Sequence, residues 1–190
     1  MSENFENIEE NNEELSMDMI RLLTIDDFCQ LLSTPAPVPG GGSVSAYVAS
    51  LGAALAGMVA NLTSGKKKYA EYQDEIEDII KAANILRDDL MEGISKDAES
   101  FLPLAGAYSL PANTEEEKRI KEKTLEELLV VAASAPLELI KKIIPAMEIL
   151  ERLTDIGTKL AISDVGTGLL LCDAAATAAA LNVYCNTKLM

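Results

Sequence analysis

The stretch from Ser43 to Gly65 limits the fold of this chain more than any other feature, because it has no charged residue and is rich in Ala, Gly and Ser. A helix that is apolar on every side lies either at the centre of a bundle or in a membrane. This stretch is long enough to span a bilayer. However, it lacks the density of Leu, Ile and Phe typical of a strong membrane span, and it contains Asn61 near its end. We therefore expect a buried helix from about Ser43 to Thr63, and no membrane span.

Small residues give this expected helix a face that another helix can approach very closely, and a second copy of the chain is one candidate for that helix. The small residues are Gly52, Ala53, Ala56, Gly57 and Ala60. The composition favours helices over sheets, because only 4% of the residues are aromatic, Trp is absent and large β-branched residues are few. We predict an all-α protein, a compact multi-helix bundle with the small-residue helix at its centre, and we expect it to dimerise.

Charge and length set the domain organisation that we expect. The chain has 190 residues, enough for one domain with a substantial core. Residues 1–20 contain acids and no base, which predicts an acidic tail before a single helical domain at 21–190. A net charge of −15 disfavours binding to nucleic acid and to anionic membranes. The N-terminus lacks the apolar segment of a secretory signal, so we expect a cytoplasmic protein.

The chain has no histidine, which excludes a Ser-His-Asp triad, a Cys-His pair and a zinc site built on imidazole. We expect no metal site. The three cysteines, Cys29, Cys172 and Cys185, form no CxxC pair, and their number is odd. This pattern predicts buried thiols in a reducing compartment.

Caps and prolines predict the helix boundaries. We expect a short helix from Thr24 to Ser33, a rigid loop at 34–42 and, after the chargeless helix, a helix from about Lys68 to Leu110 that Pro103 can kink. Thr114 to Glu117 resembles a capping box and should begin a helix that Pro136 interrupts or kinks. Two further helices are expected, at about 137–153 with a bend near Pro145, and from a cap at Ser163 to about Asn186.

Two neighbouring segments are candidates for binding an anion. Pro35 to Ser43 is a proline segment that ends in Gly40, Gly41, Gly42 and a possible helix cap at Ser43, and such a turn can direct several N–H groups at one point. The alternative is a plain helix entry, since the segment matches neither a Walker A motif nor a dinucleotide fingerprint. Lys66, Lys67 and Lys68 are either a solvated turn or the one positive spot on an acidic surface.

Asp97 is the strongest candidate for a catalytic residue, because helical spacing places it on the same apolar helix face as Leu90, Ile94 and Phe101. Burial of a carboxylate is costly without a partner and raises its pKa, which suits an acid–base catalyst. A buried structural ion pair is the alternative.

Residues near the C-terminus supply further candidates. Asp164 lies in the first turn of the last predicted helix, where it either stabilises the helix dipole or takes part in a site. Asp173 is a weaker candidate of the Asp97 kind. Asn182 and Asn186 are four residues apart and share one helix face, where they can either bond a heterocycle or tie helices together.

Several segments together resemble the formiminotransferase-cyclodeaminase family. They are residues 37–47, 51–69, 96–101, 110–118, 162–166 and 181–183, and the most specific part runs from Pro-Gly-Gly-Gly-Ser at 39–43 to Gly-Lys-Lys-Lys at 65–68. The likeness is to the cyclodeaminase domain and to stand-alone methenyltetrahydrofolate cyclohydrolases, and it covers about 22–186. It implies an all-helical subunit that dimerises, with a folate site in or near the interface.

The resemblance implies one of two activities. The first closes 5-formimino-tetrahydrofolate to 5,10-methenyl-tetrahydrofolate with release of ammonia, and we place this cyclodeaminase reaction first. The second hydrolyses 5,10-methenyl- to 10-formyl-tetrahydrofolate. A non-catalytic folate-binding or scaffold protein is the alternative from another class. The chain departs from the expected family pattern at Leu102-Pro103, at Arg119-Ile-Lys-Glu122 and just before Asn186.

The expected site follows from the resemblance and the residues together. We expect a tetrahydrofolate derivative as substrate and no tightly bound cofactor. Asp97 and Asp164 are the expected catalytic residues. The expected substrate-binding residues are Gly40, Gly41, Gly42, Ser43, Asn61, Lys66, Lys67, Lys68 and Asn182.

Overall fold

The computed structural model describes residues 17–188, and every regular element in this range is a helix. Two short helices, α2 (Met17–Ile20) and α3 (Ile25–Leu32), precede four long ones. The long helices are α4 (Gly41–Thr63), α5 (Gln73–Ala107), α6 (Glu115–Ile156) and α7 (Ile162–Lys188). Short 3₁₀ turns, η1 (Lys67–Tyr72) and η2 (Lys159–Ala161), lead into α5 and α7.

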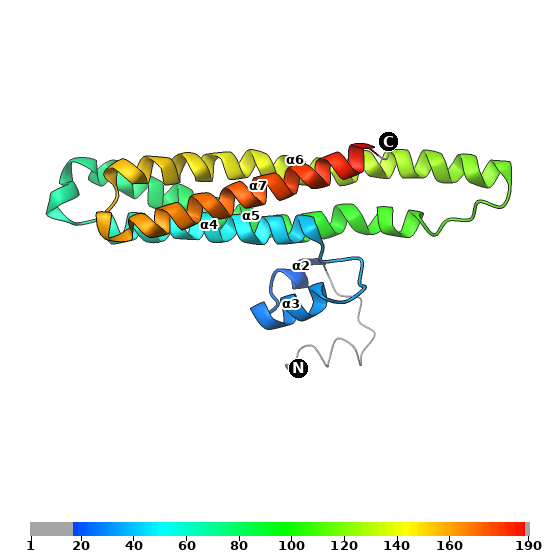
Figure 1. Ribbon diagram of the computed structural model, residues 1–190, viewed down its shortest axis with the longest axis horizontal. Helices are drawn as coiled ribbons and strands as arrows, with labels where there is room; N and C mark the ends of the chain where they lie inside the picture. Colours follow the sequence, from blue (N-terminus) through cyan, green and yellow to red (C-terminus); the bar gives the residue numbers. More distant parts are fainter. Residues whose placement is uncertain (1–16, 189–190) are drawn as a thin grey trace.

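The four long helices lie side by side as an elongated bundle, with α2 and α3 against one flank (Figure 1). α4 and α6 each pack along both α5 and α7. The predicted all-α, multi-helix bundle is confirmed. Its core consists of large side chains that are at most 2% exposed, and each stabilises the fold by about 1.5–3 kcal/mol; examples are Leu90, Ile94, Ile143, Leu150, Leu153 and Ile156.

Glycines let α4 and α7 approach closely. A Cβ on Gly52 would lie 3.1 Å from the Gly168 carbonyl oxygen of α7 and would also overlap Cys172 Sγ. The helix that packs against this part of α4 is therefore α7 of the same chain. A second copy of the chain was one candidate for this helix from the sequence alone. The other face of α4 stays open, because Leu51, Met58 and Leu62 are 39–48% exposed.

Two helices are long and apolar enough to cross a membrane by length and composition alone, one being α4 and the other spanning 159–188. Core helices of soluble proteins pass the same test. In the most apolar window of α4, 61% of the residues are buried within the bundle, as the sequence predicts. The corresponding fraction for 159–188 is 22%, so this apolar helix is much less buried in the bundle than α4.

Prolines do not divide the helices as predicted. α6 is one helix of 42 residues that continues through Pro136 and Pro145, so the separate helix expected at 137–153 is wrong. α5 continues through Pro103 to Ala107, as predicted. A proline removes one backbone hydrogen bond from a helix, and packing against neighbouring helices can offset that loss. The capping box at Thr114 and Glu117 is confirmed in full.

Other helix starts confirm some expectations and correct others. Thr24 caps α3 as predicted, accepting a bond from the Asp27 N–H at 3.1 Å. Ser43 is no cap, because α4 begins at Gly41 with Gly40 in the cap position. Ser163 is no cap either, since the η2 turn leads into α7 at Ile162.

The N-terminal part of the described chain is packed against the bundle. Residues 1–16 of the predicted acidic tail lie outside the described residues. Ile20 belongs to the core at 1% exposure, although the tail was predicted to extend through residue 20. The Phe28 and Tyr47 rings lie 5.6 Å apart and join α3 to α4.

The α5–α6 hairpin continues beyond the ends of α4 and α7 (Figure 1). This two-helix extension has a small core of its own, formed by Leu104, Leu129 and Ala132 with Phe101, Leu125 and Leu128 packed against them. Only Cys172 of the three cysteines is buried, so the prediction of buried thiols is wrong for Cys29 and Cys185. Burial raises the pKa of the Cys172 thiol to about 11.

Candidate active site

Asp97 lies on α5 against the first turn of α4. The hydroxyl of Ser43, which is fully buried, donates a hydrogen bond to Asp97 Oδ2 at 2.9 Å. The position on the packed face of α5 agrees with the helical spacing of Asp97 with Leu90 and Ile94, both of which are buried. No basic side chain forms an ion pair with Asp97 among the described residues, so the structural ion pair considered for it is not observed.

Gly42 makes room for this carboxyl group. A Cβ at residue 42 would overlap the Asp97 carboxylate, so only glycine fits the present arrangement. Gly42 and Ser43 lie in the first turn of α4, where backbone N–H groups have no partner within the helix. The negative group at this helix start is therefore the protein's own Asp97.

Two opposing effects act on the pKa of Asp97. Burial raises the pKa, because the charged form loses contact with water. Hydrogen bonds from the Ser43 side chain and backbone act in the opposite direction, but the pKa of Asp97 remains above its ordinary value. A carboxyl group whose pKa is raised in this way holds a proton more readily than an ordinary aspartate, which suits general acid–base catalysis.

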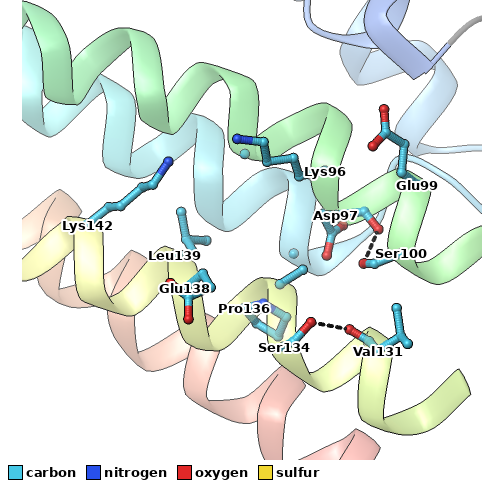
Figure 2. A pocket seen from close by; sticks show the side chains of 13 residues that line it. Lys96, Asp97, Glu99, Ser100, Val131, Ser134, Pro136, Glu138, Leu139 and Lys142 are labelled. Carbon is cyan, nitrogen blue, oxygen red and sulfur yellow. Dashed lines mark hydrogen bonds between the residues drawn. The ribbon is translucent and has the colours of Figure 1, made fainter. Parts of the chain in front are cut away.

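Asp97 adjoins two cavities. The larger has a volume of about 400 Å³ and lies between α5 and α6, with Gly42, Lys96, Asp97, Pro136, Leu139 and Lys142 among its lining residues (Figure 2). The smaller, of about 170 Å³, lies beyond the start of α4 and is lined by Pro37, Val38, residues 40–42, Asp97, Phe101, Ala132, Pro136, Asn182 and Asn186. Gly42, Asp97 and Pro136 border both cavities, so the carboxyl group lies where they meet.

Two lysines of the larger cavity were not singled out by the sequence. Lys96 Nζ lies 3.2 Å from Glu92 Oε2 in an exposed pair. Lys142 Nζ lies 3.6 Å from Asp89 Oδ2, and its side chain is 31% exposed. Figure 2 shows Lys96 on α5 and Lys142 on α6, both away from the Asp97 carboxyl. The lining of the cavity therefore combines Asp97 with two lysines, and Glu99 and Glu138 line it as well.

The two asparagines of α7 also reach this region. Asn182 donates to the Ala178 carbonyl oxygen of its own helix at 3.0 Å, and its amide lies beside Gly41. Asn186 donates from Nδ2 to the Ala132 carbonyl oxygen of α6 at 3.0 Å. Of the two alternatives from the sequence, the tie between helices is therefore observed for Asn186.

The remaining predicted site residues lie at the other end of α4. Lys66, Lys67 and Lys68 follow the C-terminus of this helix, whose 23 residues span about 35 Å. Lys66 Nζ bonds Thr158 Oγ1 at 3.2 Å, in the connection that leads to α7 and Asp164. Within one chain the lysine cluster therefore does not share a site with residues 40–43, and Asp164 does not share one with Asp97.

Two more candidates lie outside the Asp97 region. Asn61 donates to the Gly57 carbonyl oxygen of its own helix at 2.8 Å, near the C-terminal end of α4. Asp173 is exposed, whereas Asp97 is half-buried, so the two carboxyl groups are not alike. Among the described residues, no group of three or more His, Cys, Asp or Glu side chains could hold a metal ion.

Comparison with known proteins decides the family. Residues 24–190 match the family described as formiminotransferase-cyclodeaminase. The chain belongs to the formiminotransferase-cyclodeaminase family. This result confirms the resemblance that was drawn from the segments between residues 37 and 183.

Three relatives differ in how much of their own length this chain matches. A methenyltetrahydrofolate cyclohydrolase of Methylorubrum extorquens is 39% identical over 165 residues, which cover 87% of this chain and 79% of the relative. The formimidoyltransferase-cyclodeaminase of Rattus norvegicus is 31% identical over 85% of this chain, but the match spans only 30% of the rat protein. The crystal structure of a formiminotetrahydrofolate cyclodeaminase from Thermotoga maritima has a TM-score of 0.77 at 34% identity, with 87% of this chain and 79% of that one covered. Two of these relatives are named for tetrahydrofolate chemistry, and this chain is an enzyme of the same family.

Proposed function

We propose that this protein is a folate-dependent one-carbon enzyme that hydrolyses 5,10-methenyl-tetrahydrofolate to 10-formyl-tetrahydrofolate. The observation that supports a catalytic role is the Asp97 carboxyl group, held by Ser43 between two cavities with a raised pKa. The cyclohydrolase relative matches along most of both chains at 39% identity. This likeness reverses the order expected from the sequence, where the cyclodeaminase reaction was placed first.

Asp97 can supply both proton transfers of this hydrolysis. As a base, the carboxylate takes a proton from the water that adds to the cationic methenyl carbon. The same group then returns a proton to N5 as the carbon–N5 bond breaks, while the new hydroxyl loses its proton to form the formyl group on N10. One water is consumed and one proton is released. A carboxyl group with a raised pKa suits this dual role, because it takes up a proton more readily than an ordinary aspartate and can then return it to the substrate.

The distribution of charge in the larger cavity suggests an orientation for the substrate. The one-carbon centre would lie at Asp97, and a carboxylate of the glutamate portion would lie near Lys142. Lys142 is a better candidate than Lys96, since its partner Asp89 is farther away, at 3.6 Å against 3.2 Å for the Lys96–Glu92 pair. We retain Lys66, Lys67 and Lys68 as contributors to long-range attraction of the anionic substrate.

Cyclodeaminase activity is the second candidate, and the likeness to the Thermotoga maritima structure supports it. In that reaction N10 attacks the formimino carbon and the nitrogen of the formimino group leaves as ammonia. Asp97 would protonate the leaving nitrogen. The same carboxyl group fits both reactions, so the substrate must be identified by assay.

Two absorbance assays separate the candidates. Purified protein is mixed with 5,10-methenyl-tetrahydrofolate in one assay and with 5-formimino-tetrahydrofolate in the other, and methenyl absorbance is followed. We expect accelerated loss in the first assay. Formation in the second assay without accelerated loss in the first would identify a cyclodeaminase and contradict our proposal. Tight folate binding with neither change would indicate a binding protein.

We also propose that two copies associate through the open face of α4 and α7. Leu51, Met58 and Leu62 are exposed on α4, and Leu170 and Leu181 of α7, the helix that packs along it, are 72% and 61% exposed. A second copy would cover this face and place α4 at the centre of the assembly, in agreement with the sequence prediction.

Sedimentation of single-residue variants tests this assembly. Leu170→Glu should shift the protein from dimer to monomer, because it would bury an unpaired charge in the interface. Ile85→Glu is a matched control, since Ile85 is 63% exposed but lies on α5. A wild-type protein that sediments as a monomer at micromolar concentration would contradict the dimer.

A further inference from the structure

Pro136 leaves one backbone acceptor of α6 without its helical partner. In an α-helix the N–H of each residue bonds the carbonyl oxygen four residues before it, and proline has no N–H. The acceptor that loses its partner here is the carbonyl of Ala132. Ala132 is only 4% exposed, so water has little access to compensate. A buried carbonyl without a partner is destabilising, so its bonding partner has to be found elsewhere.

Asn186 supplies the missing donor from another helix. Its Nδ2 donates to the Ala132 carbonyl oxygen at 3.0 Å, across 54 positions of sequence. The amide thus takes the place of the absent N–H of residue 136. α6 remains continuous through Pro136, and the C-terminal part of α7 is joined to it at this point.

The bond lies in the wall of the candidate site. Ala132, Pro136 and Asn186 line the smaller cavity together with Asp97. The adjoining part of α6, residues 131–142, supplies one side of the larger cavity, including Pro136 and Lys142 (Figure 2). The distance between this wall and Asp97 therefore depends on how α6 is held at Pro136.

We propose that Asn186 is a positioning residue, which fixes the α6 wall of the active site by bonding the carbonyl that Pro136 leaves free. Its effect on turnover rests on the proposed folate activity, whereas its coupling to Pro136 does not. The proposal also couples the asparagine to the proline. Pro136 leaves the Ala132 carbonyl without a donor, and the Asn186 bond contributes to stability only because that donor is missing.

A double-mutant cycle on stability tests the coupling. Asn186→Ala should lower the folded-to-unfolded ratio by roughly 5- to 30-fold in urea unfolding. Most of this loss should disappear in the Pro136→Ala background, where residue 136 regains an N–H for Ala132. Asn186→Asp tests the donor itself, since it keeps the shape of the side chain and removes the N–H, and it should be at least as damaging as alanine.

Pro145 provides the matched control in the same helix. The carbonyl that it leaves free belongs to Lys141, an exposed residue. Asn186→Ala should cost the same in the Pro145→Ala background as in the wild type. Equal losses in the wild-type, Pro136→Ala and Pro145→Ala backgrounds would overturn the coupling.

The kinetic cycle tests the positioning role. Asn186→Ala should lower kcat/KM by about tenfold, mainly through KM, with the pH midpoint of kcat unchanged because Asp97 keeps Ser43. In the Pro136→Ala background the further loss should be small. An undiminished loss there would mean that Asn186 acts by touching substrate, and unchanged kinetics with a coupled loss of stability would mean that its role is structural only; either result overturns the positioning role. If the wild type has no folate activity, the stability cycle still decides whether the pair exists.

Discussion

The two ends of α4 look equally suited to bind an anion in the sequence, yet the structure makes them different. At the N-terminal end, Gly42 lets the helix lie against a half-buried carboxyl group, Asp97, and two cavities open beside it. At the C-terminal end, Lys66, Lys67 and Lys68 are exposed. The first end can place a proton donor beside an enclosed ligand, whereas the second offers exposed positive charges that attract an anion.

The difference lies in what surrounds the charge. The Asp97 carboxyl is largely removed from water, which raises its pKa, and its partners are neutral hydrogen-bond donors of Ser43, the hydroxyl and the backbone N–H. The C-terminal end is a polar junction, in which the Tyr69 hydroxyl accepts a bond from the Lys159 N–H at 3.3 Å and Thr63 Oγ1 accepts one from the Thr158 N–H at 2.9 Å. These bonds join the α4–α5 and α6–α7 connections, so this end has a structural role of its own.

The largest expected effect separates the two carboxyl groups that the sequence grouped together. Asp97→Asn should lower kcat by about 10²–10⁴-fold, because the amide cannot exchange a proton with the substrate. Asp164→Asn should lower kcat far less. Within one chain, Asp97 lies at the N-terminal end of α4, whereas Asp164 lies near its C-terminal end. Steady-state kinetics with 5,10-methenyl-tetrahydrofolate measures both. Equal losses would show that the two ends act in one site, built from two copies.

The next largest effect concerns the glycine that admits Asp97. Gly42→Ala should destabilise the protein by about 1–3 kcal/mol through steric overlap with the carboxyl group. It should also lower kcat by about 100-fold, the size of effect that a displacement of about 1 Å can have. Gly106→Ala is the control, because a Cβ there meets no atom within 4 Å and alanine should favour the helix by about 0.5–1 kcal/mol. Urea unfolding and kinetics would contradict our view of the site if both variants behaved alike.

A smaller effect compares the lysines of the two ends. Lys142→Gln should raise KM roughly tenfold, as expected for loss of a charge-assisted bond to a substrate carboxylate. The triple change Lys66→Gln, Lys67→Gln, Lys68→Gln should raise KM less than about threefold, and added salt should abolish the difference. KM measured at low and high ionic strength tests this order. The reverse order would place the substrate's anionic end at the lysine cluster.

The smallest effect is on stability as a function of pH. The pKa of Asp97 is raised in the folded state, so protonation of this group favours the folded protein. This contribution to the free energy of unfolding is complete at pH values below the ordinary pKa of 3.8, and it is lost as the pH rises through the pKa of the folded state. Asp97→Asn should therefore be more stable than the wild type above that window and should lack this loss. Urea unfolding at several pH values gives the difference directly. A variant that is less stable at neutral pH would contradict the desolvation of Asp97.

Much of the bundle could be predicted from local chemistry. Thr24 and Thr114 identify helix starts because their side chains bond backbone N–H groups within three residues. The phase of Asp97 with Leu90 and Ile94 places it on the packed face of α5. These inferences succeed since each depends on residues within a few turns of one helix.

What the sequence missed depends on contacts between helices. Pro136 and Asn186 were both noticed, but nothing local links a proline in α6 to an amide in α7. Lys142 looks like any solvated lysine until α6 is placed opposite α5. The separation of Lys66 from Ser43 could be inferred from the sequence, because the helix predicted between them sets their distance. The prediction of one site in a single chain that contains both residues did not take the length of this helix into account.

The two-helix extension of α5 and α6 has a consequence for how the molecule opens. Its small core around Leu104 and Leu129 is separate from the main core, so its backbone hydrogen bonds should exchange with solvent through local openings that leave the bundle intact. Amide hydrogen exchange should therefore be faster in α6 before Leu129 than after Pro136. The Asn186–Ala132 bond lies at the boundary between these parts, where the extension borders the site, and we expect it to oppose fraying of the hairpin there.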